Sequence, residues 1–274
     1  MHWNVDNPPD ERITFETGGA VQAIMAETEE FRARLVHYAP GTRIRAHQHK
    51  NCYLSLLLLG SMHEELADSA HYHLAPFTSF MSPGTQHANV YGPHGGLCLV
   101  IDFPADAMKH LLGRTLAETM GRRQILSRSG QEHVSLCSKL LLERAPIAPE
   151  TIRDIAAPLA CRQETGQTAP DWVDSATELI EVSDAPISVS ALAEAYGTHR
   201  VHFTRSFKLR HGITPKRYQL DLQCLRALSD YVFDNVPLTE AALKAGFCDL
   251  SHNARETRKR TGVPPVQIAN LLKD

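Results

Sequence analysis

Three histidines in the N-terminal third stand at spacings that suit a ligand or metal site. His47 and His49 are two residues apart, so on a β-strand their side chains point to the same face. His87 follows a Pro-Gly turn at Pro83-Gly84, just past another short apolar run. Converging imidazoles bind zinc, iron, manganese or another divalent ion, and they also line pockets without a metal. We therefore expect a divalent metal ion or a small-molecule effector at His47, His49 and His87, with Tyr53 beside them.

A second set of residues is basic and recurs fifty positions further along the chain. His202, Arg205, Lys208, Arg210, Gly212 and Pro215 are repeated as His252, Arg255, Arg258, Arg260, Gly262 and Pro265. Each copy predicts a short helix, a turn at Gly197 or Gly246, a second basic helix, and a Gly-Pro stop. This pattern indicates two helix-turn-helix units in tandem. The alternative is a helical bundle whose Arg and Lys side chains are only solvated.

The first basic helix has two distinct faces. Phe203 and Phe207 are four residues apart and should pack inward, with Thr198 as the helix cap. A second face carries Val201, Thr204, Arg205 and Lys208. One aromatic stripe and one Arg, Thr and Lys stripe suit insertion into the major groove of double-stranded DNA. Arg205 and Arg255 are then expected to read bases, and phosphates would be held by Lys208, Arg210, Arg258, Lys259 and Arg260.

The charge distribution supports this separation of roles. The net charge of the chain is −3. From Ser188 onward there are 13 Lys and Arg against 8 Asp and Glu, whereas the residues before Ser188 contain 15 Lys and Arg against 23 Asp and Glu. A basic end on an acidic body favours a polyanionic partner for that end, although solvated faces can also be unbalanced by chance. The six cysteines have no CxxC spacing, and no apolar run approaches the roughly 18 residues of a membrane span. We expect a cytoplasmic protein without a signal peptide or membrane contact.

The 274 residues are enough for two domains, and the pattern predicts an α+β multidomain chain. Residues 1–103 contain short apolar runs bounded by Gly and Pro, which indicate a β-sandwich or β-barrel. Residues 104–168 change to helical periodicity and end in a polar linker. These helices either form a homodimer interface or pack on the barrel. Residues 169–274 predict an all-α domain.

Two motifs of the N-terminal part resemble those of the cupin barrel. They read Gly41-x5-His47-x-His49-x3-Tyr53-x6-Gly60 and Pro83-Gly84-x2-His87. Two departures stand out: Tyr53 occupies the position of the cupin glutamate ligand, and the second motif has PG where cupins have PxG. The resemblance implies a barrel with an effector pocket or a metal site around these residues.

The C-terminal part resembles the AraC/XylS family of transcription regulators over about 100 residues. The matching residues are Phe-x-Arg-x-Phe-Lys at 203–208, Gly-Ile-Thr-Pro at 212–215, Ala-Gly-Phe at 245–247, Ser-His at 251–252 and Gly-Val-Pro-Pro at 262–265. By this resemblance the base-facing positions are Arg200, Val201, Thr204 and Arg205 in the first unit, and Leu250, Ser251, Ala254 and Arg255 in the second. It implies a regulator with a sensing barrel, a homodimer, and RNA polymerase as a further partner.

The second unit departs from the family at two positions. Asn253 and Thr257 stand where aromatic residues are usual. Either the helix shifts its register, or the unit is loosely held, which would leave specificity mainly to the helix over 198–210. Two other functions stay open at this point: a metal or redox sensor through His47, His49, His87 or Cys52, and a metal-dependent cupin enzyme.

Overall fold

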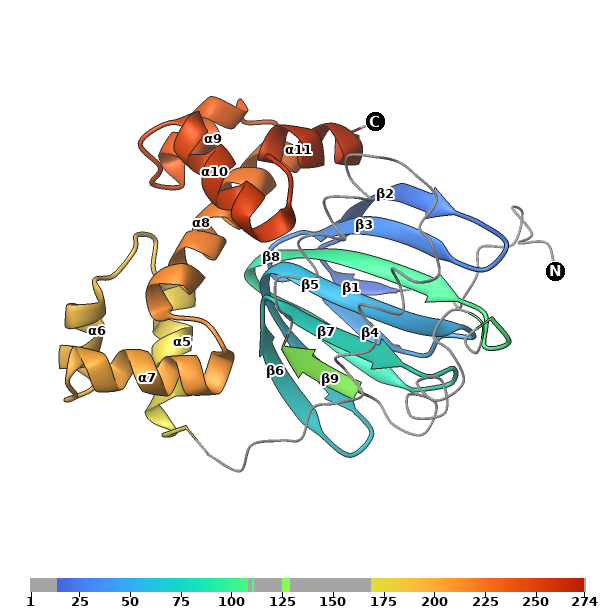
Figure 1. The fold of residues 1–274 in the computed structure, drawn as a ribbon, viewed down its shortest axis with the longest axis horizontal. Coiled ribbons are helices and arrows are strands. Elements are labelled where there is room, and N and C mark those ends of the chain that lie inside the picture. Colours follow the sequence, from blue (N-terminus) through green and yellow to red (C-terminus); the bar gives the residue numbers. More distant parts are fainter. Residues whose placement is uncertain (1–13, 108–109, 111–124, 129–168, 274) are drawn as a thin grey trace.

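The computed structural model describes residues 14–107, 110, 125–128 and 169–273, and the account below concerns these residues. They form a strongly curled antiparallel sheet with a group of helices packed against one side of it (Figure 1). None of the helices within these ranges is long and apolar enough to cross a membrane.

The sheet contains nine described strands, and all of their pairings are antiparallel. Its main path runs β1-β4-β8-β5-β7-β9, with β3 also on β8, β2 on β3 and β6 on β5. The strands are β1 (Phe15–Thr17), β2 (Ala20–Glu27), β3 (Arg32–Tyr38), β4 (Arg43–His47), β5 (Cys52–Leu66), β6 (Ala70–Leu74), β7 (Phe77–Met81), β8 (His87–Phe103) and β9 (Ile125–Arg128).

The long strands β5 and β8 bend together and so close the sheet on itself. Their pairing is irregular between Leu57 and Met62, where Gly60 adopts a φ of 94° and faces Gly96. Only glycine adopts such a conformation without strain. The bend brings Tyr38 of β3 onto Tyr91 of β8, with ring centroids 3.9 Å apart. The barrel predicted from the sequence is thus confirmed as a curled sheet with an apolar cluster on its inner face.

The opposite face of the sheet is also buried, because helices cover it. Along β8, Cys98 and Val100 face the interior, whereas Leu99 and Ile101 belong to a second core shared with the helices. Leu225 and Leu228 of α8 (Pro215–Val232) lie in that shared core. A strand buried on both faces needs a continuous apolar run rather than an alternating one, which explains the sequence of 97–101.

The helical part contains two helix-turn-helix units joined by α8, as the repeat predicts. The remaining helices are α5 (Trp172–Val182), α6 (Val189–Ala195), α7 (Arg200–His211), α9 (Leu238–Lys244), α10 (Leu250–Thr261) and α11 (Pro265–Lys273). Helices α6 and α7 form the first unit and α9 and α10 the second. Gly212 and Gly262 end α7 and α10 in the left-handed conformation, with φ of 78° and 82°. The cap of α7 is His199, not Thr198 as expected, because the helix begins one residue later than the sequence suggested.

The middle segment adds one feature to the predicted domain plan. Residues 125–128 form β9, which pairs with β7, so the sheet takes a strand from the range 104–168 that was expected to be helical. The helices and the polar linker expected between 129 and 168 lie outside the described residues, and with them the expected dimer interface.

Candidate functional sites

The first candidate site is the exposed face of α7. Arg200, Arg205 and Lys208 are exposed, Thr204 is half-buried, and Val201 has 51% of its surface exposed. On the opposite side Phe203 and Phe207 are fully buried. Phe203 stacks on Trp172 of α5 at 5.2 Å, and Phe207 lies 6.1 Å from Tyr218 of α8. The predicted inward and outward faces of this helix are therefore confirmed.

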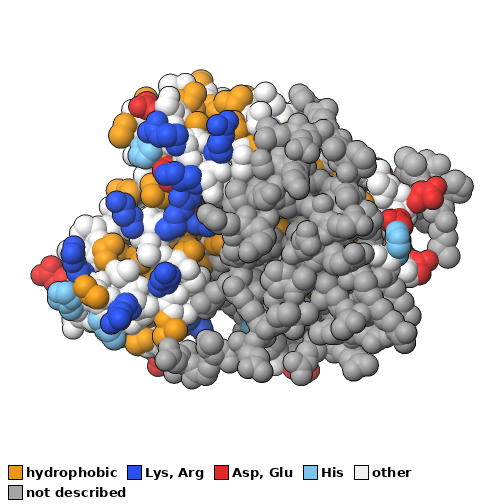
Figure 2. Space-filling model, in the orientation of Figure 1, with side chains coloured by type: hydrophobic (Ala, Val, Ile, Leu, Met, Phe, Trp, Pro, Cys, Tyr) orange, Lys and Arg blue, Asp and Glu red, His pale blue; other side chains and the backbone are white. Residues whose placement is uncertain are grey.

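Helix α10 presents the equivalent face of the second unit. Ser251, Arg255, Arg258 and Lys259 are exposed, and Leu250 and Ala254 are half-buried. Lys and Arg side chains gather over the helical part, on the left of Figure 2. The side chains predicted to face bases on α7 and α10, together with Lys208, Arg258 and Lys259, therefore reach the surface in whole or in part. Two recognition helices on one rigid connecting helix can enter successive major grooves of a duplex.

Three of the basic side chains predicted to hold phosphates already form ion pairs within the protein. Lys259 pairs with Glu256 at 2.5 Å but stays 62% exposed. Arg260 of α10 pairs with Asp221 of α8, and the side chains of these residues are 13% and 0% exposed. The expectation that Arg260 holds a phosphate is therefore wrong, since its charge neutralises a buried carboxylate. Arg210 of α7 forms a bidentate pair with Asp174 of α5 at 2.9 and 3.0 Å. That pair is half-exposed, so Arg210 stays near the surface but is held toward α5.

The positions that lack aromatic rings in the second unit are buried all the same. Asn253 and Thr257 are 0% and 1% exposed, so the register of α10 matches that of α7. Thr257 donates its hydroxyl to the Asn253 side chain at 3.0 Å. Arg217 of α8 bridges Glu256 of α10 at 2.9 Å and Asp221 at 2.6 Å. Charged pairs thus fasten this helix to α8 where the first unit uses rings.

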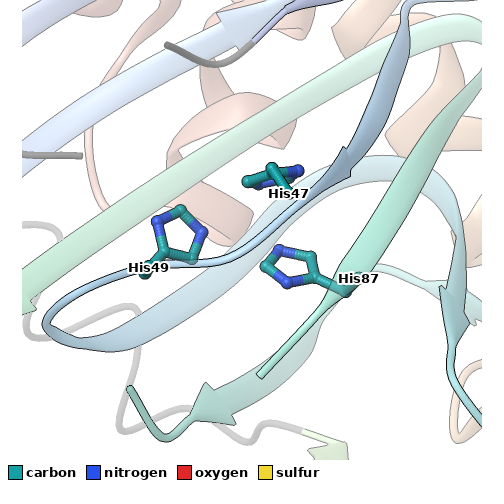
Figure 3. Close-up of side chains that lie close together, drawn as sticks. All are labelled: His47, His49 and His87. Atoms are coloured by element: carbon teal, nitrogen blue, oxygen red, sulfur yellow. The ribbon is translucent and has the colours of Figure 1, made fainter. Parts of the chain in front are cut away.

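The second candidate site is the cluster of His47, His49 and His87 (Figure 3). His47 ends β4, His49 lies in the following loop, and His87 begins β8 directly opposite His47. One ring nitrogen from each histidine lies within 4.8 Å of the others. The predicted convergence of these three side chains is confirmed. Such a triad leaves coordination positions open on a divalent ion, as a site that takes a further ligand requires.

Hydrogen bonds set the chemistry of two of these rings. Nδ1 of His47 lies 2.9 Å from the Arg45 carbonyl oxygen, and Nδ1 of His87 lies 3.2 Å from that of Thr85. A neutral ring that donates from Nδ1 carries its lone pair on Nε2, which is the atom that ligates a metal. Burial, and then the nearby His47 and His49, lower the pKa of His87 to about 3. His87 is therefore a neutral imidazole near pH 7.

Tyr53 joins the cluster but does not replace the missing glutamate. Its ring stacks on His49 with centroids 4.4 Å apart. Burial of Tyr53 raises the pKa of its phenol well above the ordinary value. The phenol thus stays protonated and supplies no negative charge to an ion. These four residues offer a mostly buried wall suited to an organic ligand or to a metal held by three histidines.

Other buried polar residues were not found by sequence reasoning. Glu64 and His73 line the interior of the sheet at 1% and 8% exposure. Glu181 of α5 accepts hydrogen bonds from Ser61 of β5 and Tyr218 of α8. The part of β5 after Gly60 and the whole of β6 contain several polar residues, a composition typical of exposed strands. The bend at Gly60 turns this part of the sheet inward. The sequence therefore gives no local signal for these positions.

Comparisons with known proteins agree with the helical part. Residues 192–270 match the family described as a helix-turn-helix domain. The regulatory protein Ada of Salmonella typhimurium is 31% identical over 98 residues, which cover 36% of this chain. The chain spans only 27% of the length of that relative.

Solved structures resemble the chain more distantly. ToxT from Vibrio cholerae is 9% identical, with a TM-score of 0.37 over 89% of this chain and all of that one. A cupin superfamily protein from Desulfitobacterium hafniense is 15% identical, with a TM-score of 0.30 over 31% of this chain and 78% of that one. With the paired units in place, residues 192–270 form a helix-turn-helix domain, which follows the curled antiparallel sheet of the N-terminal part.

Proposed function

We propose that this chain is a transcription regulator that binds double-stranded DNA through α7 and α10 and is controlled by a small molecule in the barrel. One observation carries the proposal: Arg205 and Arg255 occupy equivalent exposed positions on two helices that are both anchored to α8. Arg205 and Arg255 would read base edges, while Lys208, Arg258 and Lys259 would neutralise phosphates. A homodimer and a contact with RNA polymerase belong to the same proposal.

The route from barrel to DNA runs through β3 and α8. Tyr38 of β3 faces the barrel interior, and the preceding His37 faces α8. Nε2 of His37 lies 3.0 Å from the Ser229 hydroxyl, and its ring lies 4.8 Å from that of Phe233. An effector that fits only one position of β3 would therefore bias the position of α8. Binding shifts an equilibrium only by such a difference in affinity between two arrangements.

A second function, metal sensing, is favoured by the histidine cluster. His47, His49 and His87 would hold the ion, which would act as a Lewis acid and attract an oxygen or nitrogen of an effector. Redox sensing through Cys52 has less support. That thiol is fully buried, and burial raises its pKa to about 12, so it is a weak nucleophile toward oxidants. An ion held by three histidines would also leave positions open for a substrate, as a metal-dependent enzyme requires.

DNA selection from a random duplex pool tests the proposal. The full chain is expected to enrich a sequence with two elements about one helical turn apart. Arg205→Ala should weaken binding to the enriched duplex by about 1–3 kcal/mol and relax the preference at one base pair. Lys216→Ala, at an exposed position on α8, is the control and should bind as the parent does. The absence of any enrichment, or full binding by Arg205→Ala, would contradict the proposal.

A further inference from the structure

The barrel interior contains a buried acid and base that face one another. Nε2 of His73 lies 3.7 Å from Oε2 of Glu64, which is too far for a good hydrogen bond. The side chains are 8% and 1% exposed, and neither of these two atoms has a hydrogen-bond partner within the described part of the chain. A buried polar atom without a hydrogen-bond partner is costly, so a protein rarely keeps one without a use.

The pair lies beside the histidine cluster on the same wall. Glu64 is directly opposite Asn89 in the β5–β8 pairing, and His87 lies two residues before Asn89. Diagonal neighbours of this kind are roughly 7–8 Å apart and share one face of the sheet. His73 of β6 stacks on Phe77 with centroids 3.7 Å apart. A small molecule placed between His87 and Glu64 would span the two groups.

The surroundings of Glu64 are mostly apolar, apart from His73 and from Asn89 and His71, which lie opposite it on β8 and β6. Met62 and Phe77 belong to the interior core, and Leu66 packs against it. Burial is the largest cause that lowers the pKa of His73, so its imidazole is neutral near pH 7. A ligand therefore meets a mostly apolar wall with one unpartnered carboxyl oxygen and one neutral ring. A carboxylate ligand would be repelled there, whereas an N–H or O–H donor would satisfy the unpartnered oxygen.

We propose that Glu64 and His73 bind the hydrogen-bond-donating head group, an amine or an alcohol, of a small apolar effector whose body lies toward His87. This inference rests on the proposed function, because it names the chemistry of the effector that the barrel would sense. Recognition of the head group is thereby assigned to β5 and β6, in addition to His47, His49 and His87, which the motif spacing identifies.

Three probes with one ring and different head groups test this assignment: benzylamine, benzyl alcohol and benzoate. Binding to the full chain would be measured by calorimetry and by the shift in thermal unfolding, with a chelator present. Benzylamine and benzyl alcohol are expected to bind and to raise the unfolding temperature, and benzoate is expected to do neither. Glu64→Gln keeps the volume of the side chain and should weaken benzylamine at least tenfold.

Glu65→Gln is the matched control. Glu65 is the next residue of β5, its side chain is 61% exposed, and its carboxylate lies 3.8 Å from His63. This variant should bind all three probes as the parent does. His73→Asn provides a second variant and should weaken benzyl alcohol. Unfolding curves without probe establish that each variant is folded, and Glu64→Gln should melt close to the parent because it keeps the volume of the side chain.

Three results would overturn the assignment: benzoate binding as tightly as benzylamine, unchanged binding by Glu64→Gln, or no binding of any probe. Each of these binding results is independent of the outcome of the DNA selection. A chain that enriches a duplex but binds no probe remains a regulator without this head-group site. A chain that binds the amine but enriches no DNA keeps the site and loses the regulator.

Discussion

Arg260 belongs to the second recognition helix, yet its guanidinium pairs with the fully buried carboxylate of Asp221 on α8. Asp221 also forms an ion pair with Arg217 at 2.6 Å, and Arg217 forms a second ion pair with Glu256. Burial raises the pKa of Asp221, and the two guanidinium groups oppose this increase. The orientation of α10 therefore depends on a carboxylate that lies outside the helix it positions.

Asp221→Asn should release α10 without disturbing α7. Removing one partner of a buried ion pair leaves other charges uncompensated and costs about 3–5 kcal/mol. The expected result is a lower unfolding temperature and a footprint on the selected duplex that loses one of its two elements. Asp174→Asn, which breaks the half-exposed pair with Arg210, should cost less than about 1 kcal/mol. Equal loss of both DNA elements in Asp221→Asn would contradict a role confined to α10.

Gly60→Ala should destabilise the fold where the bend of the sheet packs against α8. An added Cβ would lie 2.4 Å from the Gly95 carbonyl oxygen and 2.8 Å from Cδ2 of Leu225, and the φ of 94° is itself strained for alanine. The left-handed backbone alone costs about 1–2 kcal/mol. Gly84→Ala is the control, because its φ is 78° but no atom lies within 4 Å of the added Cβ. Denaturant unfolding should show a larger loss for Gly60→Ala, and equal losses would exclude the packing effect.

The stability of the chain should fall as the pH is lowered below about 6.5. Burial lowers the pKa of His37 to about 3, so the unfolded chain takes up a proton at this site before the folded chain does. The stabilising contribution is complete above pH 6.5 and decreases between pH 6.5 and 3, by about 1.4 kcal/mol for each pH unit at most. Urea unfolding of the parent and of His37→Leu checks this, since the variant should have a shallower slope. Parallel slopes would show that His37 does not cause the dependence.

A divalent ion should bind at His47, His49 and His87. Titration of the metal-stripped chain with Co²⁺ should give visible absorption bands from nitrogen ligands, and His87→Asn should lose them. His63→Asn changes a half-exposed histidine outside the cluster and should keep the bands. A parent protein that shows no bands at millimolar Co²⁺ would leave the cluster as the wall of an organic pocket.

The sequence predicts what depends on local spacing, and it misses what depends on the bend of the sheet. Phe203 and Phe207 were placed inward because helical periodicity is a local property. His47 and His49 were placed on one face for a similar reason. The prediction for Arg260 is wrong because an arginine three positions after Thr257 gives no sign of the aspartate that it meets on α8. Glu64 was missed because its face is decided at Gly60, where two strands change direction together.

The joint between the two parts of the chain has a consequence for protein engineering. Glu181 accepts hydrogen bonds from Ser61 of the sheet and from Tyr218 of α8, and the apolar core beside it contains side chains from both parts. A chimera that fuses this reader to the sensor of another regulator would leave the Glu181 carboxylate partly unpaired and would expose Leu225 and Leu228. Transplantation of this specificity therefore requires grafting the outward faces of α7 and α10 alone, with α8 and its contacts to the sheet left intact.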